Sequence, residues 1–494
     1  MSKDKASHKQ ILRSTGIIGG TQVISIVMGI LRTKIIAMIL GPAGIGTMGV
    51  FQSIIDLVNQ LTSFGINFSS VKDIAEANAS NNKIKLAKTA LILRRWSLAT
   101  GLLGMMLTII FCIPISNYSF SNNSYALSIA CISITILLGS ISGGQLAMLQ
   151  GMRKIEQLAK ASLYGAFAGL SITVPLYWWL GINGIVPGLI LTAFLLYIFS
   201  WLYVRKIQIE KVKLSLIETF RGGLGMARLG FFIIITGFMA SATLYVVRAF
   251  LVEKMDLNAV GYFQACWMIT NMYLGTMLNA MLADFFPRLT EVNNDNTASN
   301  KLINEQMEIT LLVGSPMIVG IIAFAALIIQ FLYSFSFTLA IPVLQWQMAG
   351  TFFILVSWPL GVMFLAKSKG IFSLITESIW SCVFILFVYI GWDYFGFITL
   401  GIAFVFASFI RAIAVYLSTL YLGEFKFSFI NIKFFLIYGA LVSSILINVR
   451  VNQGYRQYII SAIILMITLL ISYLNLNKMI NIRGFINNKI GRKG

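Results

Sequence analysis

Histidine is nearly missing from this 494-residue chain, in which His8 is the single example. That scarcity argues against histidine-based acyl transfer and against histidine metal sites. Cysteine is also rare, and Cys112, Cys131, Cys266 and Cys382 all lie in apolar runs without metal-ligand spacing, so we expect small core side chains there. No G-x-x-x-x-G-K-[ST] phosphate-binding loop occurs, so the chain is not expected to hydrolyse ATP by itself.

Charge is the other scarce property. Only 11% of the residues are charged, whereas 58% are hydrophobic and the mean hydropathy is +0.85. A soluble protein of this length cannot have that composition, so the sequence predicts an all-α polytopic membrane protein. The acidic residues number 17 against 37 Lys and Arg, which gives a net charge of +20. We interpret this charge as topology and contact with anionic lipid head groups, not as a sign of nucleic acid.

Apolar stretches of about 20 residues predict about fourteen transmembrane helices. Their approximate ranges are 14–40, 45–70, 87–113, 125–151, 158–180, 184–206, 226–252, 258–284, 307–333, 338–366, 370–392, 397–423, 432–450 and 456–475. Most Lys and Arg fall on one side of these spans, which predicts cytoplasmic N- and C-termini. The external connections are short, as in "GPAG" at 41–44 and "GING" at 181–184.

An internal repeat divides the chain. Arg248 follows Arg32 by 216 positions, Arg288 follows Lys72 by the same interval, and "AGIG" at 43–46 resembles "NAVG" at 258–261 with a one-residue slip. An even number of spans per repeat predicts two bundles related by an axis along the membrane normal. The predicted parts are a six-helix bundle at 1–206, a cytoplasmic linker at 207–225 that could lie flat on the membrane, a second six-helix bundle at 226–425, and two additional helices with a basic tail at 426–494.

Three segments resemble a known family. "STGIIGGTQVISIVMGILRTKIIAMILGPAGIGTMGVFQSI", "LQGMRKIEQLAKASL" and "PLYWWLGINGIVPGLI" are similar to the Wzx-type O-antigen and oligosaccharide flippases of the multidrug/oligosaccharidyl-lipid/polysaccharide exporter superfamily. The resemblance extends over roughly residues 10–425. The last two helices look more like those of fourteen-helix lipid II flippases.

The resemblance implies a non-enzymatic function in lipopolysaccharide or other polysaccharide biosynthesis. An undecaprenyl-pyrophosphate-linked oligosaccharide, such as an O-antigen repeat unit, would cross from the cytoplasmic to the outer leaflet of the bacterial inner membrane by alternating access. No cofactor is expected, and the coupling ion would be H⁺ or Na⁺. Expected partners are this lipid-linked substrate, membrane lipids and glycan polymerase machinery, and no nucleic acid.

Cations inside apolar spans are the candidate binding residues, because charges in a membrane usually mark substrate paths. Arg32 lies about 12 Å along its helix from the outer end, and its repeat counterpart is Arg248. A guanidinium remains protonated and offers paired donors to phosphate oxygens. We therefore predict pyrophosphate binding by Arg32, Arg248 and Arg411, with helix anchoring by snorkelling as the alternative. Lys34 points away from Arg32 and is expected to snorkel or pair.

Acidic and inner-face residues form a second group. Asp56 is predicted either to serve ion coupling or to pair with Arg32 or Lys34, and Glu377 either to serve coupling or to pair with Arg411. Lys72, Arg288 and Lys367 are predicted to form an inner gate or to capture the head group, with topology as the alternative. The aromatic run "YWW" at 177–179 is expected in the interfacial belt.

Two other functions are weighed against flipping. A multidrug or cation exporter of the same superfamily would need an acidic cavity, whereas cations predominate inside these spans. A membrane glycan polymerase or ligase would be expected to present catalytic groups in a sizeable external loop, which the short outer connections disfavour.

Overall fold

The computed structural model describes residues 2–80, 82–210 and 212–480, with side chains at 27–479 apart from positions 67, 68, 81, 211, 225–233, 273 and 283. Every regular element in these ranges is helical, which confirms the predicted all-α class. The side chain of His8 and the basic tail after residue 480 lie outside the described parts. The chain forms two compact units, which are described separately: unit 1 comprises residues 1–261 with 332–334, and unit 2 comprises 262–331 with 335–494.

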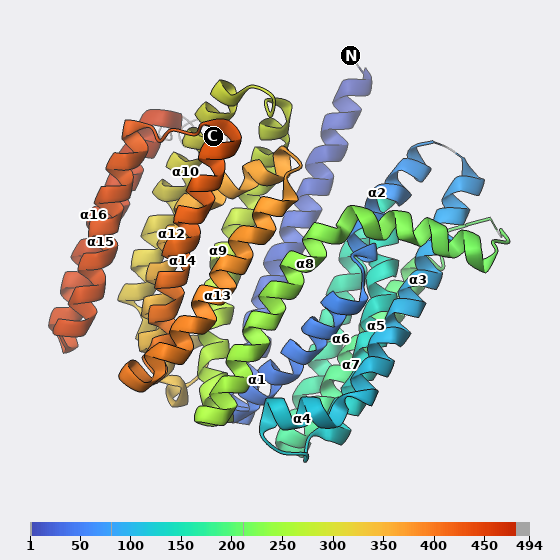
Figure 1. Ribbon diagram of the computed structural model, residues 1–494, viewed down its shortest axis with the longest axis horizontal. Coiled ribbons are helices and arrows are strands. Elements are labelled where there is room, and N and C mark those ends of the chain that lie inside the picture. The colour runs from blue at the N-terminus through green and yellow to red at the C-terminus, as the bar shows by residue number, and fades with distance from the viewer. Residues whose placement is uncertain (1, 81, 211, 481–494) are drawn as a thin grey trace, which may run out of the picture. The chain divides into compact units, whose positions relative to one another are not determined.

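The helices of unit 1 follow one another with short connections (Figure 1). They are α1 (Ser2–Thr62), α2 (Ile66–Ala79), α3 (Lys83–Ile110), α4 (Cys112–Phe120), α5 (Ala126–Gly151), α6 (Ile155–Leu180), η1 (Gly181–Gly184), α7 (Ile185–Val204), α8 (Leu216–Lys254) and the first residues of α9 (Leu257–Glu291).

Unit 2 contains the rest of α9 and the later elements. They are α10 (Asn296–Ala323), α11 (Ala325–Leu332), η2 (Phe335–Phe337), α12 (Ala340–Ala366), α13 (Gly370–Phe395), η3 (Gly396–Ile398), α14 (Thr399–Gly423), α15 (Phe429–Val451) and α16 (Gly454–Ile480). The predicted spans at 432–450 and 456–475 correspond to α15 and α16.

Element α1 is two helices joined at a sharp kink. Gly41 has φ 63° and ψ −167°, and Pro42 follows it. Glycine adopts this positive φ without the steric cost that a Cβ would bring, and proline is tolerated in the first turn of the next helix. A break between two helices within the predicted connection at 41–44 is therefore confirmed, although only Gly41 departs from helical geometry and the external side of this connection remains a prediction. The predicted span 45–70 is wrong at its end, because Phe64 and Gly65 both have positive φ and interrupt the helix before α2.

Ten stretches of described helix are long and apolar enough to cross a membrane. Two of them, Ile155–Val204 and Gly370–Gly423, each contain two helices joined by a 3₁₀ turn. The chain is thus a multi-pass membrane protein, while the count of about fourteen spans and the sidedness of the termini remain predictions.

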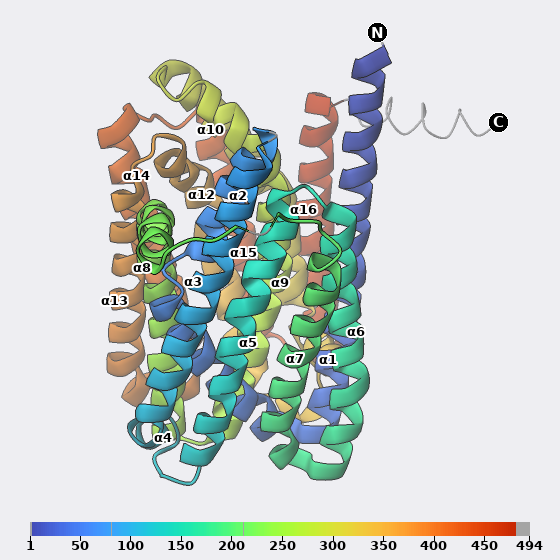
Figure 2. The same cartoon turned by 90° about the vertical axis from the view of Figure 1, so that its right-hand side faces the viewer.

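Within unit 1, α3 packs against α5 and α6 against α7, and these helices run nearly parallel in Figure 2. Ser140 on α5 donates to the Ser97 carbonyl oxygen of α3 at 2.7 Å, and its hydroxyl lies 3.1 Å from that of Thr100. Gly144 leaves room for Ser97, since a Cβ there would lie 2.3 Å from Oγ. Small residues and interhelical hydrogen bonds of this kind drive helix association in lipid.

Within unit 2, α12 packs against α10 and α14, and α15 and α16 pack against α10. Asparagines of α10 hold the connection between α14 and α15: Asn300 donates to the Gly423 carbonyl oxygen at 3.1 Å, and Asn304 donates to that of Lys426 at 2.9 Å. The additional helices are joined to each other by Asn448, whose amide donates to Ser461 Oγ at 2.9 Å.

All four cysteines are free, but they are not uniformly part of a core. Cys266 is buried, Cys112 and Cys131 are half-buried, and Cys382 is exposed. The expectation of four core cysteines is therefore wrong for Cys382. This residue lies on α13, which packs mainly on α14 and leaves its other side uncovered within unit 2.

Candidate functional site

A buried arginine and a carboxylate meet within unit 1. Arg248 of α8 is 4% exposed although it carries a charge, and it interacts electrostatically with Asp56 of α1. The Asp56 carboxylate also accepts a hydrogen bond from Gln52 Nε2 at 2.8 Å. The charged group that the structure brings near Asp56 is thus Arg248, which the sequence did not predict, while pairing of Asp56 with Arg32 or Lys34 remains a prediction. This proximity depends on where α8 crosses α1, which local sequence does not specify.

Asp56 belongs to a polar stripe on α1. Gln52, Asp56 and Gln60 follow one another at intervals of four residues, so they share one face of the helix. Gln52 and Asp56 are exposed, whereas the adjacent Phe51 is buried. Gln60 lies against α8, since a Cβ at Gly237 would be 2.9 Å from Gln60 Oε1. The second half of α1 therefore presents hydrogen-bonding groups beside α8.

Aromatic side chains continue this region one helical turn before Arg248. The Tyr245 hydroxyl lies 2.8 Å from Ser119 Oγ of α4, and the Tyr245 ring stacks on Tyr118 with centroids 5.6 Å apart. Sequence reasoning missed Gln52, Tyr245 and Ser119. The four-residue spacing of Gln52 and Asp56 was a usable signal, whereas nothing local indicated that α4 would fold back against α8.

Arg32 lies in a different setting from its repeat counterpart. It is half-buried on the first half of α1 and lies near Tyr177, which is fully buried at the end of α6 and whose hydroxyl makes no hydrogen bond within the described residues. Gly188 of α7 makes room for that phenol, because a Cβ there would lie 2.7 Å from the Tyr177 oxygen. Tyr177 thus packs among α1, α6 and α7 instead of facing outward, while the interfacial position expected for 177–179 remains a prediction.

Unit 2 contains one of the predicted pairs. Arg411 Nη2 of α14 lies 3.4 Å from Glu377 Oε2 of α13, with side-chain exposures of 31% and 15%. The structure thus shows the pairing alternative for these residues. Roles in substrate binding for Arg411 and in coupling for Glu377 remain predictions.

Exchanging the charges of this pair tests its role. Glu377→Ala leaves the Arg411 guanidinium without its carboxylate, and we expect a loss of roughly 1–2 kcal/mol in a partly exposed site. The double exchange Glu377→Arg with Arg411→Glu is expected to recover most of that stability in thermal unfolding. If Arg411 also binds an anionic substrate, the double exchange will recover stability but not transport. Recovery of both would limit the pair to a structural role.

The predicted inner-face cations have local partners. Lys72 pairs with Glu76 at 3.7 Å and Arg288 with Asp284 at 3.2 Å, both as exposed pairs four residues apart. Such pairs contribute only about 0.2–0.5 kcal/mol each.

Lys367 is held more firmly than these two. Its Nζ donates to Asn296 Oδ1 at 2.7 Å and to the Leu422 carbonyl oxygen at 3.3 Å. It thereby joins the end of α12 to α10 and α14, which is a structural arrangement that the sequence did not reveal. Gating or head-group capture by these three cations remains a prediction.

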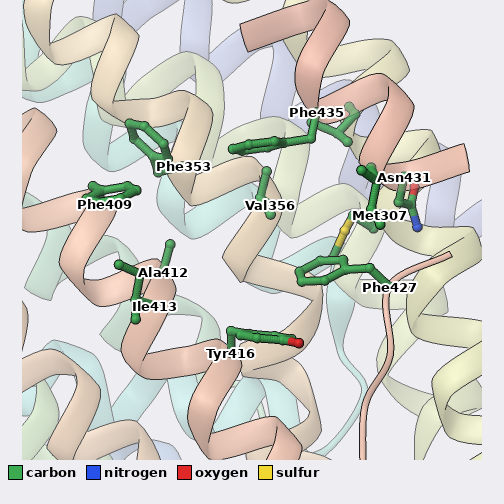
Figure 3. Close-up of a pocket in the computed structure, with 12 residues that line it drawn as sticks. Met307, Phe353, Val356, Phe409, Ala412, Ile413, Tyr416, Phe427, Asn431 and Phe435 are labelled. Atoms are coloured by element: carbon green, nitrogen blue, oxygen red, sulfur yellow. The ribbon is translucent and has the colours of Figure 1, made fainter. Parts of the chain in front are cut away.

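An apolar cavity of about 200 Å³ lies among α10, α12, α14 and α15 of unit 2. Figure 3 shows aromatic rings around it, and Asn431 is the amide at its edge. The aromatic lining residues are Phe353, Phe409, Tyr416, Phe427 and Phe435. Asn431 is already engaged, since its amide donates to the Asn304 carbonyl oxygen at 2.9 Å. This cavity offers hydrocarbon contact and almost no free polar group.

Known proteins share sequence features with much of this chain. The sequence profile of the family described as "Polysaccharide biosynthesis protein" matches residues 35–342. The lipid III flippase of Escherichia coli (strain K12) is 22% identical over 362 residues, which is 72% of this chain and 85% of that protein. The lipid III flippase of Shigella flexneri matches equally well.

Solved structures share the fold over most of the chain. A lipid II flippase MurJ in an inward closed conformation superposes with a TM-score of 0.71 at 16% identity, covering 94% of this chain and 99% of that one. An inward-facing multidrug resistance MATE family transporter of the MOP superfamily superposes with a TM-score of 0.67 at 16% identity, covering 80% and 94%. At these identities the likeness establishes the fold.

Proposed function

This chain belongs to the polysaccharide biosynthesis protein family, and from that premise we propose that it is a flippase for a lipid-linked glycan. Relatives named lipid III flippase and a structural neighbour named lipid II flippase support a lipid cargo. The family description supports a glycan on that lipid. The proposed cargo is an undecaprenyl-pyrophosphate-linked oligosaccharide, such as an O-antigen repeat unit, moved from the cytoplasmic to the outer leaflet of a bacterial inner membrane.

The observation that carries this proposal is the charged Arg248 buried in unit 1 beside the exposed Asp56. A charge inside an apolar span costs at least about 2.5 kcal/mol, so such a charge is expected mainly where it has a functional role. A guanidinium donates two parallel hydrogen bonds to phosphate oxygens. We propose that Arg248 binds one phosphate of the cargo, with Arg32 and Arg411 as further binding residues.

Binding of a phosphate by Arg248 or Arg411 would have to compete with a nearby carboxylate. Asp56 interacts electrostatically with Arg248, and Glu377 forms an ion pair with Arg411. An incoming pyrophosphate would compete with each carboxylate for the guanidinium. A carboxylate released in this way would be free to take H⁺ or Na⁺, which would couple cargo binding to an ion gradient in an alternating-access cycle.

The lipid part of the cargo needs an apolar surface. The cavity among α10, α12, α14 and α15 is lined almost entirely by apolar side chains (Figure 3). Burial of hydrocarbon there is favourable by about 0.8 kcal/mol per CH₂ relative to water. We propose that part of the polyprenyl chain can enter this cavity from the surrounding lipid. The sugar chain would then be passed to glycan polymerase machinery.

A reconstituted flipping assay tests the function directly. The full chain is placed in vesicles that contain a fluorescent lipid-linked oligosaccharide, and exposure of the label in the opposite leaflet is followed with a membrane-impermeant quencher. We expect protein-dependent transfer that vesicles with an unrelated membrane protein do not show. Absence of glycan transfer together with export of a cationic dye would replace this proposal by the multidrug alternative.

A further inference from the structure

The first turns of α8 form a separately anchored segment in unit 1. Ser215 caps the helix, because its hydroxyl accepts from the Glu218 amide at 3.1 Å while Glu218 Oε2 accepts from the Ser215 amide at 2.8 Å. This reciprocal capping box fixes where the helix begins. The hydrogen bond from the Ser215 backbone holds the pKa of the exposed Glu218 carboxyl below its ordinary value, so that carboxyl is ionised at neutral pH.

This segment is docked on α3 by specific contacts. Arg95 Nη1 donates to the Leu214 carbonyl oxygen at 3.0 Å and to Thr219 Oγ1 at 2.8 Å, and Trp96 Nε1 donates to the Thr219 carbonyl oxygen at 2.8 Å. The Trp96 ring stacks on Phe220 with centroids 5.6 Å apart. Figure 1 shows this first part of α8 lying across the end of α3 before the helix turns to run alongside the bundle of unit 1.

The docking site coincides with the polar boundary of α3. Lys83, Lys85, Lys88, Arg94 and Arg95 all precede Trp96, whereas residues 97–110 contain no charged side chain. A helix that crosses a membrane enters the hydrocarbon where its charges end, and tryptophan is enriched at that level. The segment on Arg95 and Trp96 is therefore held at the membrane interface.

An apolar stripe on the segment is largely uncovered within the described part of unit 1, although one of its side chains, Phe220, stacks on Trp96. Leu216, Ile217, Phe220 and Leu224 are 81%, 67%, 59% and 48% exposed. Their successive spacings are one, three and four residues, so they share a helix face. Exposed cations lie on the segment and on the part of α3 that holds it, namely Lys88, Arg94, Lys213 and Arg221. Uncovered apolar side chains at the interface together with flanking cations are the composition of a helix that lies in the interface plane.

We propose that residues 213–224 are an anionic-lipid anchor, in which the apolar stripe inserts among acyl chains and Lys88, Arg94 and Arg221 bind phospholipid head groups. The level at which α3 holds the segment favours acyl chains over a protein partner as the cover of the stripe. Flanking Lys and Arg complement the phosphate charge of the lipid. The proposal is independent of which cargo the protein moves.

Depth and lipid binding can be measured on the full chain in nanodiscs. Ile217→Cys, in a chain whose four native cysteines are replaced by alanine, is labelled with an environment-sensitive fluorophore. Lys301→Cys on α10, an exposed polar position, is the matched control. In bilayers of phosphatidylcholine with phosphatidylglycerol, we expect the label at 217 to emit at shorter wavelength and to resist iodide. The label at 301 should be quenched by iodide.

The number of retained lipids gives a second readout, measured on chains that keep their native cysteines. Native mass spectrometry counts bound phosphatidylglycerol in the unmodified chain and in Arg94→Gln and Arg221→Gln variants. Each lost cation is expected to lower phosphatidylglycerol retention roughly fivefold, with phosphatidylcholine unchanged. The Lys301→Gln chain should behave like the parent.

Three results would overturn the anchor. Iodide access at 217 equal to that at 301, both in bilayers with phosphatidylglycerol and in pure phosphatidylcholine, would exclude insertion. Insertion that is equal in pure phosphatidylcholine, with unchanged lipid retention in both arginine variants, would exclude head-group recognition. Protection of the label at 217 only after a second protein is added would assign the stripe to a protein partner.

Discussion

Replacing Arg248 by alanine is expected to lower transport of lipid-linked glycan at least tenfold without unfolding the protein. The guanidinium is 4% exposed and lies beside Asp56, where its hydrogen bonds to a charged phosphate would contribute about 1.5–3 kcal/mol. That range corresponds to a roughly 10- to 150-fold loss of cargo affinity. The measurement is the initial rate of flipping in vesicles that contain equal amounts of each variant.

Two companion variants show what the loss means. Arg248→Lys keeps the positive charge but cannot form the paired hydrogen bonds, so partial transport is expected. Asp56→Asn keeps a group that Gln52 can contact and removes the carboxylate, so we expect transport to persist downhill while its dependence on an ion gradient is lost. Normal transport by Arg248→Ala would assign this arginine to helix anchoring alone.

Gly46→Leu is expected to prevent unit 1 from reaching its native fold. A Cβ at Gly46 would lie 1.8 Å from the Leu257 carbonyl oxygen, and a Cβ at Gly261 would lie 2.0 Å from that of Pro42. The obstacle is backbone in both cases, so no side chain can rotate away. Overpacking in a tight core costs about 1–3 kcal/mol even when neighbours can adjust, and the cost should exceed that range here.

Thermal unfolding and the yield of monodisperse protein in detergent measure this effect. Gly139→Ala on α5 is the matched control, because a Cβ there meets nothing within 4 Å. We expect the control to unfold at the parental temperature and Gly46→Leu to be recovered poorly. Equal recovery and equal unfolding temperatures would show that α1 and the start of α9 can separate at this point without cost.

Local chemistry explains what the sequence could predict. The helical class follows from the hydropathy, and the kink at Gly41 follows from a glycine and a proline between two apolar runs. The repeat match of 43–46 with 258–261 also has a structural counterpart, since a Cβ at Gly46 would lie 2.9 Å from the Gly261 amide nitrogen. The pairing of Glu377 with Arg411 was foreseeable because α13 and α14 are consecutive.

Tertiary packing decided the features that the sequence missed. The charged group near Asp56 comes from α8, nearly two hundred positions further on, and no local pattern identifies such a crossing. Tyr177 belongs to the same aromatic run as Trp178 and Trp179, which are 74% and 83% exposed. It is nevertheless buried, because Gly188 leaves room for its ring. Lys367 has the sequence signature of a free surface cation, and only the fold brings Asn296 to it.

Recognition of a diphosphate by Arg248 is the central claim, and direct binding tests it. Undecaprenyl pyrophosphate and undecaprenyl phosphate are offered at equal concentration to the parent chain and to Arg248→Ala in detergent, and retained lipid is counted by native mass spectrometry. The account predicts that the parent retains the diphosphate preferentially and that Arg248→Ala loses this preference while still binding the polyprenyl chain. Equal retention of both lipids by the parent, or an undiminished preference in Arg248→Ala, would contradict it.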